Sequence, residues 1–159
     1  MPTASTPPST RCGPLPASPD VTTGRALGLD LGKRRIGVAV SDSDRTVATP
    51  IEVIDARDLP RARRQIAELV TEWEADVGVI GLPLSLDGTD GPAAREARRE
   101  AERLAEVVGV PVELHDERLT TVTAHQTLKE LDMDAAARRR VVDQVAAAVI
   151  LQNWLEASR

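Results

Sequence analysis

Residues 25–42 contain two apolar runs that alternate with period two and are separated by only two basic residues. The runs are RALGLDLG and RIGVAVSD, and Lys33 and Arg34 join them. This alternation is typical of neighbouring strands, in which successive side chains point to opposite faces. Leucine, isoleucine and valine occupy one face, whereas the other carries glycine, alanine, serine and Asp30. The chain is therefore expected to form a β-sheet with one nearly flat face.

The rest of the chain alternates between helical and extended patterns. Apolar side chains recur at helical spacing in some segments, and short runs of β-branched residues mark others as strands. The further strands are expected at 47–54, 76–81 and 110–115, and the helices at 59–73, 92–108, 120–131 and 137–157. Three strands followed by alternating helix and strand predict an α/β domain with a mixed sheet.

The first 24 residues are rich in proline, serine and threonine and have almost no apolar periodicity. We interpret residues 1–24 as a disordered tail and residues 25–159 as a single domain. No apolar run approaches the length of about 18 residues that a membrane span needs, and no signal peptide is evident. The single cysteine cannot form an intramolecular disulfide. We therefore expect a cytoplasmic protein without a membrane partner.

The charge and the aromatic content constrain how the protein would bind nucleic acid. The formal net charge is −5, which disfavours binding through uniform positive charge but permits a local basic patch. Phenylalanine and tyrosine are absent, and the chain has two tryptophans. Platforms for stacked bases use several aromatic side chains. A nucleic-acid ligand is thus expected to be recognised by its backbone and shape.

Asp30 lies on the nearly flat face, between Gly28 and Gly32. Glycines at such positions can let a helix pack closely, or they can form bulges. Neither role accounts for the carboxylate between them, because burial of an unpaired charge is costly. A metal ion, or a phosphate bound together with a metal, would resolve this conflict.

Two other acids occupy comparable positions. Glu117 lies at the carboxyl end of the strand at 110–115, where α/β sheets tend to bind ligands. On spacing alone, a solvated turn of Asp116, Glu117 and Arg118 is the simpler interpretation. Asp143 lies in a helix whose neighbouring alanines permit close approach to a flat sheet. An aspartate near a helix N-terminus is also common because it interacts favourably with the helix dipole.

Together, three carboxylates from distant segments suggest a site with oxygen ligands. Such ligands suit Mg²⁺ or Mn²⁺. Two such ions roughly 3.5–4 Å apart can activate water and stabilise the leaving oxygen in phosphodiester cleavage. The two histidines, His115 and His125, are more simply interpreted as packing or surface residues than as ligands.

Four segments in order resemble the signature segments of the YqgF/RuvX family: GLDLGKRRIGVAVSD, GLPLSLDGT, HDERLTT and VVDQVAAAVILQNWLE. The resemblance implies an RNase H-like fold with a five-stranded mixed sheet and helices on both faces. It also implies a metal-dependent endonuclease for 5′-end maturation of pre-16S rRNA, with RNA of the pre-ribosome as its partner. The family's acidic metal site corresponds to Asp30, Glu117 and Asp143.

The chain departs from the family pattern at two positions. Ser85 stands where family members usually have Asn, so the polar contact made by that side chain is expected to be weaker. Thr123 stands where they often have Glu. If Thr120 is the N-cap, that Glu would complete a capping box, so the change concerns helix stability rather than chemistry.

Three basic clusters are candidates for contact with phosphates. The clusters are Lys33, Arg34 and Arg35; Arg95, Arg98 and Arg99; and Arg138, Arg139 and Arg140. Each can equally be an ordinary solvated turn or helix face, which is the better interpretation for the middle cluster. The first and last are close in sequence to the expected metal ligands, and we therefore expect these two to bind nucleic acid.

Other functions remain open on sequence alone. Branched DNA is an alternative substrate, because resolvases are relatives of the family. A factor without catalytic activity, bound to RNA or to the transcription machinery, is a second alternative. The first strand pair also resembles the phosphate-binding hairpin of actin-like ATPases and sugar kinases, but those proteins enclose nucleotide between two such domains. The sequence leaves the oligomeric state open.

Overall fold

The computed structural model describes residues 24–117 and 134–158. Its centre is a five-stranded sheet in the order β3-β2-β1-β4-β5. The strands are β1 (Arg25–Leu31), β2 (Arg35–Ser41), β3 (Ala48–Asp55), β4 (Ala75–Leu82) and β5 (Val112–Asp116). The described helices are α1 (Leu59–Glu72), α2 (Pro92–Val108) and α4 (Ala135–Ala157).

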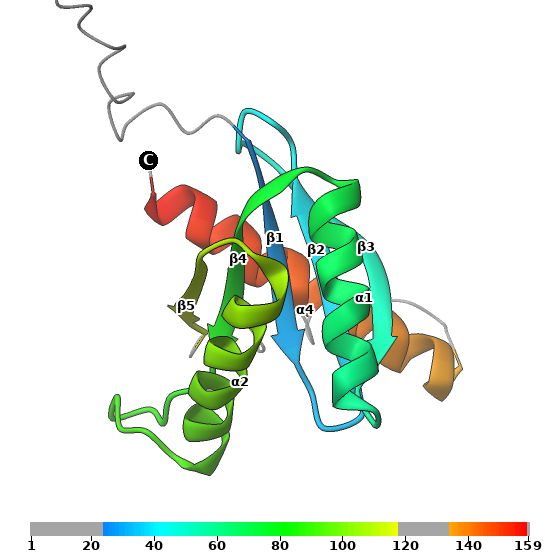
Figure 1. Ribbon diagram of the computed structural model, residues 1–159. Coiled ribbons are helices and arrows are strands. Elements are labelled where there is room, and N and C mark those ends of the chain that lie inside the picture. The colour runs from blue at the N-terminus through cyan, green and yellow to red at the C-terminus, as the bar shows by residue number, and fades with distance from the viewer. Residues whose placement is uncertain (1–23, 118–133, 159) are drawn as a thin grey trace, which may run out of the picture.

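The sheet is mixed, as expected. Strands β1, β2 and β3 pair antiparallel, whereas β4 pairs parallel with both β1 and β5. Helices α1 and α2 lie on one face of the sheet, and α4 crosses the other face (Figure 1). The RNase H-like arrangement with helices on both faces is therefore confirmed.

Strand alternation divides the core into two layers. Leu27 and Leu29 of β1 pack with Val38 of β2 in the layer beneath α1 and α2. Ala26 and Ala39 belong to the layer beneath α4. The small side chains thus face α4, and the large ones face the other two helices, as the period-two pattern predicts.

The helices begin where local residues can satisfy free backbone groups. The Asp58 side chain accepts a hydrogen bond from the Arg61 amide at the start of α1. Helix α2 begins with Pro92 and is followed by Gly109, whose φ of 71° is the left-handed conformation that commonly ends a helix. The Asp134 side chain caps α4 by accepting from the Ala137 amide.

A largely buried ion pair fastens α1 to α2. The Arg63 guanidinium donates to both carboxylate oxygens of Glu100, at 2.7 and 2.9 Å. Glu100 is 5% exposed, so its charge depends on this bidentate partner. The pair links the two helices, whose apolar residues pack on the face of the sheet opposite α4.

The expected element boundaries differ from the observed ones by at most two residues, and the helix at 92–108 has the expected bounds. Helix α4 begins at Ala135 rather than at residue 137, because Asp134 supplies its N-cap. The expected tail and the expected helix at 120–131 lie outside the described residues, and so does His125. Within the described part of the chain, no helix is both long and apolar enough to cross a membrane.

Candidate active site

The flat face of the sheet is in direct contact with the backbone of α4. A Cβ atom added to Gly37 would lie 2.6 Å from the carbonyl carbon of Asp143 and 3.4 Å from the Cβ of Ala147. A Cβ atom on Gly28 would lie 2.7 Å from the Cβ of Leu151. The glycines therefore serve the close helix packing that was one of the two roles expected for them.

This close packing brings Asp143 to Asp30. Asp30 pairs with Gly37 across the β1–β2 ladder, and Gly37 lies directly beneath Asp143. Burial, and secondarily the negative charge of Asp143, raises the pKa of Asp30 from 3.8 to about 6. Two acids that are 113 positions apart in the sequence thus share one electrostatic environment.

Glu117 approaches these two acids on the same face of the sheet, from the segment that follows the edge strand β5. Its amide donates to the Leu82 carbonyl at 3.2 Å, which holds the residue beside the end of β4. Its carboxylate lies over Gly81, where an added Cβ would be 3.0 Å from Glu117 Cδ and 2.6 Å from Ile150 Cδ1. Burial, then the charges of Asp30 and Asp116, raises the pKa of Glu117 from 4.5 to about 7.

The position of Glu117 bears on the two interpretations of its segment. A solvated turn residue would keep an ordinary pKa. Glu117 is instead partly buried, and its pKa is raised by this burial and by the negative charge of Asp30. Arg118, the partner expected in such a turn, lies outside the described residues. The geometry favours a carboxylate directed into the acidic site.

Asp143 differs from the other two acids because it has a cationic partner. Arg35 Nε donates to Asp143 Oδ2 at 2.5 Å, and the two side chains are 37% and 22% exposed. Across the described residues, no side chain donates a hydrogen bond to Asp30 or Glu117. The sequence placed Arg35 in a phosphate-binding cluster and did not indicate this contact, which joins residues 108 positions apart.

The donor set suits a hard divalent cation. Carboxylate oxygens are the ligands that Mg²⁺ and Mn²⁺ favour, and a cation would offset the burial and, secondarily, the mutual repulsion that raise the pKa values of Asp30 and Glu117. In the ranges 24–117 and 134–158, no three acidic, histidine or cysteine side chains close into a metal cage. Arg35 holds Asp143 in this arrangement, and we expect a bound cation to compete with Arg35 for that carboxylate.

The basic residues expected to bind nucleic acid fall into two groups. Arg34, Arg35, Arg139 and Arg140 line one cavity beside the acidic site, whereas Lys33 and Arg138 do not. Arg57, which the sequence did not single out, also lines this cavity. Because β2 and β3 pair antiparallel with Arg35 opposite Asp55, residues just beyond β3 lie next to the hairpin.

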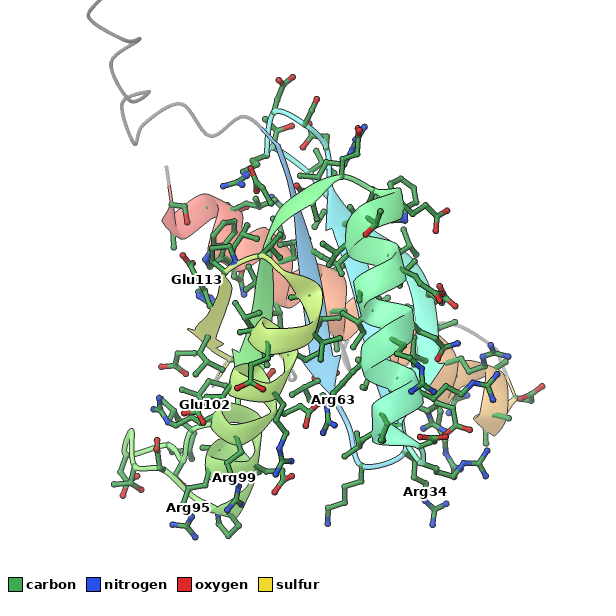
Figure 2. The ribbon with its side chains drawn as sticks, in the orientation of Figure 1. Arg34, Arg63, Arg95, Arg99, Glu102 and Glu113 are labelled. Carbon is green, nitrogen blue, oxygen red and sulfur yellow. The ribbon has the colours of Figure 1, made fainter. Side chains whose placement is uncertain are left out.

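The middle basic cluster lies elsewhere, on α2. Arg98 pairs with Asp90 at 2.7 Å, and Arg99 pairs with Glu96 at 3.1 Å. Figure 2 shows Arg95 and Arg99 on α2, well separated from Arg34 at the hairpin. These contacts agree with the interpretation of this cluster as a solvated helix face.

The mixed sheet, together with acids from β1, α4 and the segment after β5, defines an RNase H-like domain with an acidic site on one face of the sheet. Comparison with known proteins places the chain more narrowly. It belongs to the RuvX family, described as Holliday junction resolvase, which matches residues 24–157.

Close relatives of the chain are provisionally named pre-16S rRNA nucleases. The protein from Streptomyces coelicolor is 47% identical over 142 residues, which cover 89% of this chain and 85% of the relative. The protein from Myxococcus xanthus is 48% identical over 135 residues, covering 85% of this chain and 89% of the relative. The shared region includes nearly the whole described domain.

Solved structures of resolvases share the fold. RuvC of Thermus thermophilus, in complex with a Holliday junction substrate, superposes with a TM-score of 0.55 and 16% identity, covering 84% of this chain and 94% of RuvC. The fowlpox virus resolvase in complex with Holliday junction DNA has a TM-score of 0.51 and 13% identity, covering 84% and 97%. At these identities, the likeness concerns the fold alone.

Proposed function

We propose that the protein is a metal-dependent endonuclease that hydrolyses phosphodiester bonds of structured RNA in 5′-end maturation of pre-16S rRNA. The observation that carries this proposal is the convergence of Asp30, Glu117 and Asp143 on the glycine-lined face of the sheet. The names of relatives that are close to half identical supply the substrate class. The pre-ribosome is the corresponding partner.

In this proposal the three carboxylates act as ligands rather than as general bases. Asp30, Glu117 and Asp143 would hold Mg²⁺ or Mn²⁺, in a two-ion arrangement. Such ions, when bound, supply Lewis acidity that activates water and stabilises the leaving oxygen. The raised pKa values of Asp30 and Glu117 mean that cation binding releases protons near neutral pH. The protein's own contribution is to hold the ligands and to orient the strand.

The test is cleavage of a pre-16S rRNA fragment in the presence of Mg²⁺ or Mn²⁺. Asp30→Asn removes one ligand charge with little change in shape, and we expect at least a hundredfold loss of cleavage rate. Asp44→Asn, at an exposed position in the β2–β3 connection, is the matched control. Equal cleavage by a folded Asp30→Asn protein would overturn the proposed mechanism.

Two other substrates or roles are distinguished by the same variants. Resolvase activity is the second candidate because of the family description and the shared fold. It is tested by assaying a four-way DNA junction in parallel with the rRNA fragment. A non-catalytic role predicts that an Asp30→Asn allele restores 16S maturation in depleted cells. An endonuclease predicts that precursor accumulates instead.

A further inference from the structure

Next to the acidic site is a cavity of about 830 Å³, which we call the arginine groove. Three separate segments form it: the β1–β2 hairpin, the end of β3 and the first turns of α4. Its charged lining consists of Arg34, Arg35, Asp55, Arg57, Arg139 and Arg140. Arg35 belongs to both the groove and the acidic site, because its guanidinium contacts Asp143. Arg35 therefore connects the groove to the acidic site.

The groove is strongly positive in a protein that is negative overall. Five arginines against one aspartate give it a formal net charge of 5 − 1 = +4, whereas the whole chain carries −5. Asp55 is engaged by Arg57, with Nη2 to Oδ2 at 2.5 Å. Within the described ranges, no carboxylate pairs with Arg34, Arg139 or Arg140. Three guanidinium groups thus face the groove with their charge uncompensated.

The lining indicates the chemistry of the ligand. Guanidinium groups present planar, paired donors that match phosphate oxygens. They come from three separate segments of the chain, an arrangement that suits an extended chain of phosphates better than a single small anion. No aromatic side chain is among the described lining residues, so stacking on bases contributes nothing there. This composition fits recognition of a sugar-phosphate backbone without reading of bases.

The contrast with α2 shows that surface arginine alone does not produce such a site. Arg98 and Arg99 are as exposed as the groove arginines, yet each is paired with an acid on its own helix or in the preceding loop. The groove arginines converge from segments about 100 positions apart and leave most of their charge unmatched. This arrangement is what an anionic ligand would stabilise.

We propose that the arginine groove binds the phosphodiester backbone of the substrate strand beside the bond that is cleaved. Arg35 marks the point at which the strand passes from the groove to the carboxylates. Arg57 is a binding residue that neither the sequence motifs nor the family resemblance assigns. The identity of the bound strand rests on the proposed function. The affinity of the groove for a phosphodiester backbone, however, does not depend on cleavage.

The test measures binding without turnover. Fluorescence anisotropy in EDTA reports the affinity for a labelled single-stranded RNA and for a four-way DNA junction over a range of salt concentrations. The variants are Arg57→Gln, Arg139→Gln and Arg34→Gln, with Arg99→Gln on α2 as the matched control. All four residues are exposed, so the variants are expected to fold, and circular dichroism checks this.

We expect each groove variant to bind several-fold more weakly, whereas Arg99→Gln binds like the wild type. Each lost phosphate contact should also lower the slope of log affinity against log salt by about 0.7 for single strands and about 0.9 for duplex arms. The substrate strand is RNA if the single-stranded RNA binds more tightly and shows these losses in the groove variants. It is branched DNA if the four-way junction does. Wild-type affinity and slope in Arg57→Gln and Arg139→Gln, or an equal loss in Arg99→Gln, would overturn the proposal.

The outcomes separate this proposal from the proposed function. Groove-dependent binding by a protein that cleaves neither substrate would refute the nuclease and leave the groove standing. Efficient cleavage by a wild-type protein whose groove variants bind normally would refute the groove and leave the nuclease standing. Failure of the wild type to bind either ligand would overturn the groove directly.

Discussion

Replacing Gly37 with alanine is expected to destabilise the domain by pushing α4 away from the sheet. The new Cβ would lie 2.6 Å from the Asp143 carbonyl carbon and 3.4 Å from Ala147 Cβ. Carbon atoms pack favourably at about 3.5–4.0 Å, so the helix backbone must retreat by about 1 Å. No change of rotamer can relieve this contact, because the nearest atoms belong to the main chain.

The size of the effect follows from two opposing terms. Overpacking of a close contact typically costs about 1–3 kcal/mol. Alanine also makes the unfolded chain less flexible than glycine does, which stabilises the folded state by about 0.4–1 kcal/mol. We expect a net loss of about 1–2 kcal/mol, which lowers Tm by roughly 3–8 °C in a domain of this size.

Gly78→Ala, on strand β4 of the same sheet, is the matched control. A Cβ atom there would lie 3.6 Å from Val112 Cγ2, an ordinary van der Waals contact, and neither Gly37 nor Gly78 has a positive φ. Urea and thermal unfolding of both variants measure the difference. If Gly37→Ala were as stable as Gly78→Ala, the inferred contact between α4 and the flat face would be wrong.

Three further expectations concern charge. The metal-free protein should lose stability as the pH rises from about 4 to about 7, because folding raises the pKa values of Asp30 and Glu117 from 3.8 and 4.5 to about 6 and about 7 and so disfavours their ionised forms in the folded protein. A pH-independent Tm would contradict this. Asp30→Asn should flatten this dependence of stability on pH. At pH 8, Mn²⁺ should raise the Tm of the wild type by much more than it raises the Tm of Asp30→Asn. Arg63→Ala should cost about 3 kcal/mol of unfolding free energy, because Glu100 would keep a buried charge with only a distant partner, Arg103 at 3.8 Å. An unfolding midpoint equal to that of the wild type would contradict this last expectation.

Local pattern was enough to predict most of the fold. Alternation in β1 and β2 identifies the face that carries Asp30, and the small residues of both strands predict close approach of a helix. The same reasoning singles out Asp30 and Asp143 as candidates, because each lies where a strand or helix presents a charge to a surface without bulky side chains. These are properties of short segments, which a sequence displays directly. For Glu117 the spacing alone favoured a solvated turn, and the family resemblance was needed to name it as a candidate ligand.

Contacts that depend on the relative placement of distant elements could not be predicted in this way. The pairing of Arg35 with Asp143 requires the position of α4 over the hairpin, which no local spacing encodes. Arg57 joins the groove because the β2–β3 register sets Asp55 opposite Arg35. A hairpin prediction that included this register would have indicated Arg57.

The most direct test of the central claim is an anomalous difference map from crystals soaked in Mn²⁺. We predict peaks bounded by Asp30, Glu117 and Asp143, with the Arg35 guanidinium displaced from Asp143 toward the groove. Peaks bound by other residues, or an Arg35–Asp143 pair that persists at saturating Mn²⁺ without metal between the three acids, would contradict the claim that these carboxylates form the metal site.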